Sequence, residues 1–445
     1  MSGEVKAIFE PKSVVLVGAS DEIGEGIVSP AFFHSLVDNM YRCFKGETHV
    51  VDLSGKLEGA IKNLNRVPKG RDLAVVVLPP KLVMKNWRNL LNRMIKAVVL
   101  VAGGFNQQQR EELARGAAKR KVCMLGPNAT AGVINAPKGL CAMLERGFMP
   151  SRGGIAVISQ DGAVGIAILD WARFYGVGVG KFASTGDGVD VTEAELLEFL
   201  TRDKETKVIC IYLESVRDGR RFLGSIREAM KKKPVVVMKG GTARDERDKI
   251  FAASIKQVGA IRVGGIEELL GVADALAKQS PMQGDRVAVV TNAGGAATLV
   301  ADALSRKGFV LAKLSDKVTK KITGKYPDIN IVEWVDLSIG AKDDRYKFVL
   351  EQVLSDHGVD GVVVINELKL SFLEPEDVQA IAEVAEKSKD KPIVSVTVAG
   401  ESCVLVREVV KDKNVPIFDS PEKAVRALDA LRSYGKTRAR VEKGI

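Results

Sequence analysis

The sequence predicts an α/β protein made of three Rossmann- or flavodoxin-like domains. The main observation is a pattern that occurs three times: a short apolar run, a turn of small residues, and a segment with helical spacing. The three turns contain Gly18, Asp161 and Asn292. The composition agrees, because 46% hydrophobic residues and 43 glycines are typical of soluble α/β proteins. A chain of 445 residues is also long enough to bury several cores.

Composition and charge disfavour several classes of protein. No apolar run approaches the roughly 20 residues of a membrane span, and the first residues do not resemble a signal peptide, so we expect a cytoplasmic protein. The five cysteines are scattered, and no cluster of Cys or His indicates a metal site. The net charge of +10 is spread along the chain without interleaved aromatic residues, which disfavours nucleic acid as a partner. Anionic small ligands or an acidic partner subunit explain this charge equally well.

Changes of pattern along the chain predict the domain boundaries. We expect a first domain at residues 1–140, a second at 150–280 and a third at 284–432. Each alternates apolar strands with helices, as parallel sheets require. The basic tail 433–445 is expected to be mobile.

The first domain contains the glycine turn of a dinucleotide-binding unit. A strand at Val14–Val17 is followed by small residues that let backbone N–H groups approach a pyrophosphate: Gly18, Ser20 and Gly24. The further strands expected here are Thr48–Leu53, Leu73–Leu78, Ala97–Val101 and Val122–Leu125. Ligands of such sheets lie at the carboxyl ends of strands, where Pro79, Gly104 and Asn128 fall. Close packing of helix on strand explains one glycine turn as well, but three turns favour a phosphate-rich ligand.

The second domain places polar residues after its strands. The strands expected here are Ile155–Ile158, Gly180–Ser184, Val208–Leu213 and Val235–Met238. Asp161 and Gly162 lie in the turn after the first of these, where a helix dipole and free N–H groups point at an anion. The alternative is that Asp161 is simply the N-cap of that helix. Glu214 directly follows the third strand.

The third domain repeats the glycine turn. A strand at Val287–Val290 runs into Asn292, Gly294 and Gly295, and a helix follows. Later strands are expected at Gly361–Ile365, Ile393–Val398 and Pro416–Phe418. We therefore expect a second helix N-terminus that is available to a phosphate.

These landmarks resemble the α-type subunit of the NDP-forming acyl-CoA synthetases, the superfamily of ADP-forming acetate–CoA ligase and succinyl-CoA synthetase. The motifs that carry the resemblance are VLVGAS (Val15–Ser20), LGPN (Leu125–Asn128), ISQDGAVGIAILDW (Ile158–Trp171), IYLESVRDGRRF (Ile211–Phe222), FAASIKQVGAIRV (Phe251–Val263) and VAVVTNAGGAATLVADAL (Val287–Leu304). The resemblance covers nearly the whole chain. It implies a CoA-binding domain followed by two ligase-CoA domains, and a family reaction that converts acyl-CoA, ADP and phosphate into acid, CoA and ATP.

The resemblance also implies ligands and partners. CoA or acyl-CoA would lie on the first domain, at Gly18, Ser20, Gly24, Pro79, Gly104 and Asn128. Glu214 matches the glutamate that supports the family's phosphohistidine, while Asp161, Gly162, Asn292, Gly294 and Gly295 match the two helix N-termini that face the phosphate. ATP or ADP with Mg would bind only to a separate β subunit with an ATP-grasp fold. The chain would therefore be part of an oligomer.

The sequence departs from this family where the phosphoryl transfer takes place. The family has a long loop with a Ser-His-Thr-Gly element that presents the nucleophilic histidine. Here the corresponding segment, Lys239–Arg247, is roughly a dozen residues shorter by comparison with the family and contains no histidine. The only histidines of the chain are His34, His49 and His357. A covalent phosphoryl relay needs a nucleophile, and no other residue is an evident substitute.

A second departure is Asp161, where the family usually has serine. A serine hydroxyl donates to a phosphate oxygen, whereas an ionised carboxylate repels it by roughly 4 kcal/mol at about 4 Å and an effective dielectric near 20. Asp161 is thus expected to fill the anion position itself. Further departures are Glu333-Trp334-Val335-Asp336 in place of Asn-Pro-Val-Asp, and one extra residue between Asn128 and Gly132.

Three functions remain open on the sequence alone. The first is an acyl-CoA synthetase α-type subunit that pairs with an ATP-grasp subunit. The second is a non-catalytic CoA-binding subunit that regulates or scaffolds an active paralogue. A possibility related to the second is an enzyme that transfers acyl or carbamoyl groups without a phosphohistidine. The third is a role of the basic surface in binding nucleic acid or the ribosome.

Overall fold

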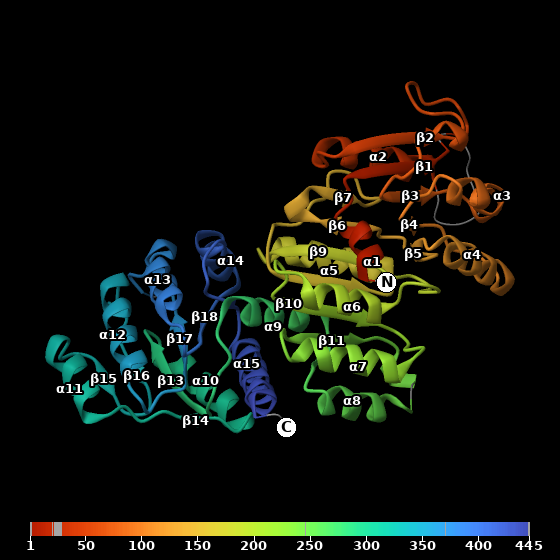
Figure 1. The fold of residues 1–445 in the computed structure, drawn as a ribbon. Helices are drawn as coiled ribbons and strands as arrows, with labels where there is room; N and C mark the ends of the chain where they lie inside the picture. Colours follow the sequence, from red (N-terminus) through yellow and green to blue (C-terminus); the bar gives the residue numbers. More distant parts are fainter. Residues whose placement is uncertain (1, 20, 22–28, 245, 370, 444–445) are drawn as a thin grey trace. The chain divides into compact units, whose positions relative to one another are not determined.

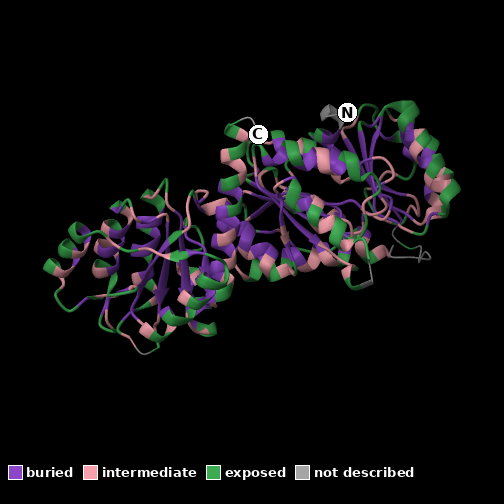
Figure 2. Cartoon of the chain, turned by 90° about the horizontal axis from the view of Figure 1, so that it is seen from below, coloured by how far each residue is buried: buried purple, intermediate pink, exposed green. Residues whose placement is uncertain are grey.

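Three sheets, almost entirely parallel, organise the computed structural model, which describes all residues except 1, 20, 22–28, 245, 370 and 444–445 (Figure 1). Contacts divide the chain into two units: residues 1–173 with 178–258, and residues 174–177 with 259–445. The strands are mostly buried and the exposed residues lie mainly on the helices (Figure 2). The architecture confirms the predicted fold class.

The first sheet has five parallel strands in the order β2-β1-β3-β4-β5. Its strands are β1 (Ser13–Gly18), β2 (Glu47–Asp52), β3 (Leu73–Val77), β4 (Ala97–Leu100) and β5 (Cys123–Leu125). The helices between them are α2 (Pro30–Cys43), α3 (Pro80–Leu91) and α4 (Gln107–Arg120). Every residue of β1, β3 and β4 is buried, as expected for a parallel sheet covered on both faces.

The second sheet belongs to the same unit, where its strands run in the order β11-β10-β8-β9-β6-β7. They are β6 (Val133–Asn135), β7 (Leu140–Ala142), β8 (Ile155–Ser159), β9 (Val179–Ser184), β10 (Val208–Leu213) and β11 (Val235–Lys239). The helices are α5 (Gly162–Phe174), α6 (Glu193–Arg202), α7 (Gly219–Met230) and α8 (Asp248–Gln257). The amino-terminal helix α1 (Ser2–Phe9) packs here too: the Phe9 ring stacks on Phe199 with centroids 5.0 Å apart.

The second unit contains the third sheet, in the order β15-β16-β13-β17-β18-β19, and β14 also pairs with β13. The strands are β13 (Arg286–Thr291), β14 (Val310–Leu311), β15 (Asn330–Ile331), β16 (Val335–Asp336), β17 (Gly361–Asn366), β18 (Ile393–Thr397) and β19 (Ile417–Phe418). The unit also holds β12 (Ile261–Val263), α9 (Ile266–Lys278), α10 (Gly294–Arg306), α11 (Asp316–Lys325), α12 (Asp343–Ser355), α13 (Gln379–Lys387), α14 (Gly400–Val410) and α15 (Pro421–Glu442). Helices α12 and α13 cover one face of the sheet, and α10 and α15 the other (Figure 1).

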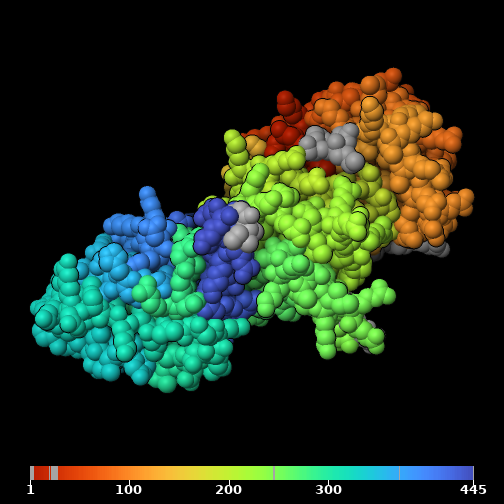
Figure 3. All heavy atoms as spheres, turned by 60° about the horizontal axis from the view of Figure 1, so that its bottom comes forward, coloured from red at the N-terminus to blue at the C-terminus, as the bar shows by residue number. Residues whose placement is uncertain are grey.

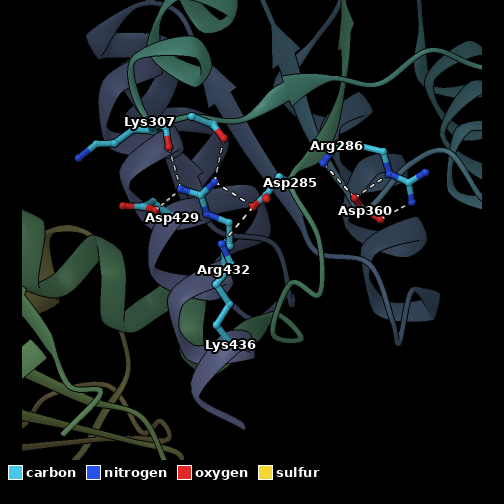
Figure 4. A network of polar contacts seen from close by, with 8 residues as sticks. Asp285, Arg286, Lys307, Asp360, Asp429, Arg432 and Lys436 are labelled. Carbon is cyan, nitrogen blue, oxygen red and sulfur yellow. Dashed lines mark hydrogen bonds and ion pairs between the residues drawn. The ribbon is translucent and has the colours of Figure 1, made fainter. Parts of the chain in front are cut away.

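The basic segment after Ser433, expected as a mobile tail, continues α15 as far as Glu442. Figure 3 shows this helix, in dark blue, at the surface of its unit. Arg432 anchors it: the guanidinium binds Asp285 and Asp429 at 3.0 and 2.7 Å (Figure 4). The same group lies 3.7 Å from the centre of the Phe309 ring. The sequence suggested a tail because basic residues dominate, but the buried face of the helix decides the outcome.

Candidate functional site

A cavity of about 300 Å³ lies at the carboxyl ends of strands in the first unit. It brings together three residues that the sequence analysis placed on separate loops: Asn128, Asp161 and Glu214. The other lining residues are Gln160, Gly186, Asp187, Gly188, Thr192, Glu193, Ala194, Ser215, Val216, Arg217, Asp218, Arg221 and Phe222. Ligands of parallel sheets bind at this edge, so the cavity is the candidate site.

The turn between β8 and α5 is closed by its own side chains. The Asp161 carboxylate accepts a hydrogen bond from the Val164 N–H at 2.8 Å, which satisfies one of the free donors of the helix N-terminus. The Ser159 hydroxyl donates to the Asp161 carbonyl at 2.6 Å and fixes the turn. Gly162 is required here because a Cβ would lie 1.9 Å from the Thr130 hydroxyl oxygen. Asp161 is therefore the N-cap that was one of the two alternatives.

Gln160 joins this turn to the end of the neighbouring strand β10. Its side-chain oxygen accepts from the N–H groups of Glu214 and Ser215 at 2.6 and 3.1 Å, and its side-chain nitrogen donates to the Ser215 carbonyl at 2.7 Å. Three hydrogen bonds from one amide thus tie the loop after β10 to this turn. Glu214 is thus positioned through its backbone.

The Glu214 side chain has a tyrosine as its partner. The Tyr212 hydroxyl donates to Glu214 Oε1 at 3.1 Å. Burial, together with the charges of Glu214 and Asp161, raises the pKa of Tyr212 to about 12. A tyrosine with this pKa stays protonated and is a poor nucleophile at neutral pH.

The loop Gly126-Pro127-Asn128 connects the first sheet to the second. The Pro127 carbonyl accepts from the Asp187 N–H at 2.8 Å, and Gly186 passes so close that a Cβ there would lie 2.3 Å from the same carbonyl oxygen. Asn128 has φ +64°, and a Cβ on Gly103 would lie 2.6 Å from its side-chain oxygen. These close contacts fix Asn128 at the rim of the cavity.

The cavity is lined mainly by negative charge. Five carboxylates face it, against two guanidinium groups. Arg221 pairs with Glu195 and Arg217 donates to the Gly188 carbonyl, so both cations already have partners. Asp187 also pairs with Arg110 at 3.3 Å. This lining disfavours a free phosphate.

The segment after β11 lies outside this cavity lining. Lys239 is almost completely buried, with its ammonium 4.0 Å from the Asp248 carboxylate and 5.7 Å from the centre of the Phe251 ring. Gly241 has φ +71°, and a short 3-10 turn, Thr242–Arg244, follows. The chain therefore passes from β11 to α8 in a short connection.

Four of the six residues predicted to bind CoA are described by the structure, and all four lie at the ends of strands of the first sheet. The other two, Ser20 and Gly24, lie outside the described residues. Pro79 and Gly104 follow β3 and β4, and Gly104 has φ +85°, which favours glycine. Gly18 ends β1, where a Cβ would lie 2.2 Å from the Phe33 ring of α2. This glycine thus has a packing role, so a Gly18→Val variant is not a clean test of ligand binding.

The helix that follows the turn after β13 has no side-chain cap at its N-terminus. Asn292 donates to the Glu367 carbonyl at 2.8 Å and accepts from the Glu367 N–H at 2.9 Å. Helix α10 begins at Gly294, and its N-cap residue, Ala293, has no side chain that can accept. A Cβ on Gly295 would meet nothing within 4 Å. This turn belongs to the second unit, and none of its residues is among those that line the cavity described above.

The sequence analysis missed the functions of Gln160 and Tyr212. The signal for Tyr212 was its position two residues before Glu214, which places both side chains on one face of the strand end. Gln160 had no such signal, because its partners are backbone atoms 54 and 55 residues away. Two absences hold for the part of the chain that the structure describes. No group of three or more His, Cys, Asp or Glu is arranged to hold a metal ion, and no helix has the length and apolar character needed to cross a membrane.

Comparisons with known proteins give a consistent result. The family model of the succinyl-CoA ligase-like flavodoxin domain matches residues 152–276. The α subunit of acetate–CoA ligase (ADP-forming) I from Pyrococcus furiosus is 30% identical, with 98% of this chain and 99% of the relative covered. Subunit α of the second such ligase of that organism is 28% identical over 96% of this chain and 97% of the relative. Among solved structures, an acetyl-CoA synthetase from Candidatus Korarchaeum cryptofilum, in complex with phosphate and ADP, has a TM-score of 0.88 and 26% identity, covering 100% of this chain and 99% of that one.

Proposed function

Because this chain belongs to the family of α subunits of ADP-forming acetate–CoA ligases, we propose that it binds CoA or acyl-CoA as an α-type subunit but carries no phosphoryl group on a histidine. CoA would lie on the carboxyl edge of the first sheet, against the loops that contain Pro79, Gly104 and Asn128. ATP or ADP with Mg would bind to a separate ATP-grasp subunit. The residues of this chain would orient the acyl-CoA, and the partner would hold the nucleotide.

One observation carries the loss of the phosphoryl relay. The Asp161 carboxylate occupies the N-terminus of α5, 2.8 Å from the Val164 N–H. A phosphate there would have to displace this carboxylate or lie beside it, and two like charges at about 4 Å repel by roughly 4 kcal/mol at an effective dielectric near 20. The helix end that would attract a phosphate therefore already has an internal anion.

The positions of the histidines support the same proposal. His34 lies on α2, His49 on β2 and His357 on the connection that precedes β17. None of them lines the cavity. Glu214, which would support a phosphohistidine, binds the Tyr212 hydroxyl instead.

The direct test combines binding with labelling. The purified full chain is titrated calorimetrically with CoA and acetyl-CoA, and is then incubated with ³²P-labelled acetyl phosphate. We expect heat of binding and no protein-bound label. A label on the wild-type chain would contradict the proposal, and mapping the labelled residue would identify the nucleophile. Absence of CoA binding would overturn the assignment of the first sheet.

A restoration experiment tests the cause. A loop with a Ser-His-Thr-Gly element is grafted between Gly241 and Asp248, alone or together with Asp161→Ser. We expect labelling only in the combined variant, because the graft supplies the nucleophile and the substitution opens the helix N-terminus. The graft combined with Asp187→Ser is the matched control, since it removes another carboxylate from the same cavity. Equal labelling of both combinations would show that Asp161 does not close the site.

A further inference from the structure

Two of the five cysteines, Cys43 and Cys141, lie where a helix of the first sheet meets the second sheet. Cys43 is the last residue of α2, and Cys141 is the middle residue of β7. These two elements pack against each other within the first unit. Both thiols are free, and Cys141 is 1% exposed whereas Cys43 is half-buried. An accessible thiol beside a buried one is the arrangement found in cysteine pairs that respond to oxidants.

The backbone brings the end of α2 directly against the start of β7. Gly139 has φ +71°, and a Cβ there would lie 2.2 Å from the Cys43 carbonyl oxygen. The chain thus passes the end of the helix so closely that this position requires glycine. Cys141 follows two residues later, about 6–7 Å further along an extended strand.

Side-chain contacts place the Cys141 thiol beside the face of α2 that carries Cys43. The Cys141 Sγ donates to the Phe148 carbonyl at 3.0 Å. The N–H group of the preceding residue, Gly147, donates to the Asn39 side chain at 2.8 Å. Asn39 lies one helical turn before Cys43, on the same face of α2. The Cys141 thiol and this face of the helix therefore border on the same two residues.

The two thiols also interact electrostatically. Burial, together with the charge of Cys43, raises the pKa of Cys141 to about 12. Cys141 is thus almost entirely protonated at neutral pH, and oxidants react with the thiolate rather than with the thiol. Cys43 is the more accessible of the two. An oxidant is therefore expected to react with Cys43 first.

Packing accounts for Cys141 but not for Cys43. A buried free cysteine behaves as a small apolar residue, and Cys141 fits this description. The other three cysteines, Cys123, Cys210 and Cys403, are buried in the same way. Cys43 is the exception because its half-buried side chain gains less from packing.

We propose that Cys43 and Cys141 form a reversible disulfide in the presence of a peroxide, and that this bond fixes the end of α2 to β7. The Cys43 thiolate attacks a peroxide oxygen, the O–O bond breaks, and Cys43 becomes a sulfenic acid as hydroxide leaves. The Cys141 thiolate then attacks the Cys43 sulfur, and the S–O bond breaks. The protons of the two thiols complete two molecules of water. The thiols lose two electrons, which reduce one molecule of hydrogen peroxide.

The disulfide would connect the two sheets of the first unit. A bond between residues 43 and 141 closes a long loop, and such cross-links stabilise a fold mainly by restricting its unfolded chain. Helix α2 also carries Phe33, whose ring would meet a Cβ on Gly18 at 2.2 Å. The bond would therefore hold in place the helix that supports the first glycine turn. This inference does not depend on the function proposed above.

The test maps the bond chemically. The reduced full chain is treated with hydrogen peroxide, free thiols are blocked with N-ethylmaleimide, and the chain is digested with trypsin without reduction. Trypsin releases the two cysteines in separate peptides, residues 43–45 and 139–146. We expect mass spectrometry to find these peptides joined, and to find them separate after treatment with dithiothreitol. The thermal unfolding midpoint of the oxidised chain should rise by about 5 °C or more.

Three variants serve as controls. Cys43→Ser and Cys141→Ala should each abolish both the linked peptide and the rise of the midpoint, whereas Cys123→Ala, which removes another buried cysteine of the same unit, should keep both. Cys43 found as a sulfinic acid or as a maleimide adduct, without a link to Cys141, would overturn the proposal. A bond between the Cys43 residues of two chains, visible as a dimer on a non-reducing gel, would overturn it as well. A linked peptide without a rise of the midpoint would show that the bond does not fix α2.

Discussion

The turn after β8 and the turn after β13 share one construction. In each, an amide side chain that follows the strand binds the backbone of a glutamate at the end of the neighbouring strand: Gln160 binds Glu214, and Asn292 binds Glu367. The difference lies one residue further along. Asp161 caps α5 with its carboxylate, whereas no side chain caps α10.

This difference shows that the conformation of the turn and the capping of the helix N-terminus are determined by different residues. We call the hydrogen bonds of Gln160 with Glu214, and of Asn292 with Glu367, amide clamps. Each clamp fixes the neighbouring loop, so the backbone geometry does not depend on a bound anion. The helix N-terminus is then either satisfied internally, as by Asp161, or left to water or a ligand, as at α10. At the second turn the nearest carboxylate to the start of α10 belongs to Asp336, whose Oδ2 would lie 3.4 Å from a Cβ on Gly294.

The two turns also differ in how much room surrounds their glycines. In Gly162→Ala, the new Cβ would lie 1.9 Å from the Thr130 hydroxyl oxygen, so we expect a loss of about 3 kcal/mol in the free energy of unfolding of the first unit. In Gly295→Ala the Cβ meets nothing within 4 Å, and we expect a change within about 0.5 kcal/mol. Urea denaturation measures both, in single-tryptophan variants that retain either Trp171 on α5 or Trp334 beside β16 and have the other tryptophans replaced by Phe. Equal losses of unfolding free energy in the two variants would contradict the expected difference between the two turns.

The clamps are expected to differ in strength because one is buried and the other is not. Asn292 is 5% exposed, and Asn292→Ala removes its two hydrogen bonds to the partly buried backbone of Glu367, whose carbonyl still accepts from the Ser371 hydroxyl; we expect a loss of about 2 kcal/mol. Gln160→Ala exposes its former partners to water and should cost about 1 kcal/mol. The same denaturation experiment compares them. A larger loss for Gln160→Ala would show that its clamp is the stronger one.

The repetition of these turns was predictable from the sequence, and so were the three sheets. Apolar runs followed by small residues determine strand and turn locally; Asp161 and Asn292 marked two of the turns, while most of the turn that Gly18 begins lies outside the described residues. The N-cap role of Asp161 was also one of two local alternatives, because capping involves residues three apart in sequence.

The contact between the loop that follows β5 and the loop that follows β9 was not predictable from the local sequence pattern. The Asp187 N–H binds the Pro127 carbonyl across 60 residues of sequence, and nothing in either loop signals the other. The basic segment around Tyr434 shows the opposite failure: its charge predicted a tail, while burial of Tyr434 and Gly435 keeps it in α15. Charge describes the exposed face of a helix and says little about the face that packs.

Removing the N-cap of α5 or adding one to α10 tests directly how much a side-chain cap contributes to stability. Asp161→Ala leaves the first N–H groups of α5 without a side-chain acceptor and should cost about 1 kcal/mol, whereas Asp161→Asn keeps the acceptor and should cost less. Ala293→Ser supplies a cap to α10 and should gain a few tenths of a kcal/mol to about 1 kcal/mol. In the single-tryptophan variants, fluorescence of Trp171 or of Trp334 reports one turn at a time. If Asp161→Ala proved neutral, the carboxylate would not be the internal anion of α5.

The smallest expected effect concerns the tyrosine beside each turn. Burial and Glu214 raise the pKa of Tyr212 to about 12, and burial raises the pKa of Tyr346, which donates to the Ile365 carbonyl at 2.8 Å in the second unit. At neutral pH, Tyr212→Phe removes one hydrogen bond and should cost about 0.5 kcal/mol.

The pH dependence separates this hydrogen bond from the titration. An unfolded tyrosine ionises near pH 10, while folded Tyr212 keeps its proton to about pH 12. The unfolded state therefore binds fewer protons in this window, and stability falls as pH rises from about 10 to 12. The Phe variant lacks this contribution, so its unfolding midpoint should fall less steeply than that of wild type over the same window. Tyr346→Phe should have the corresponding effect on the second unit only. Parallel pH curves for wild type and Tyr212→Phe would mean that burial and the neighbouring Glu214 do not hold the proton on Tyr212.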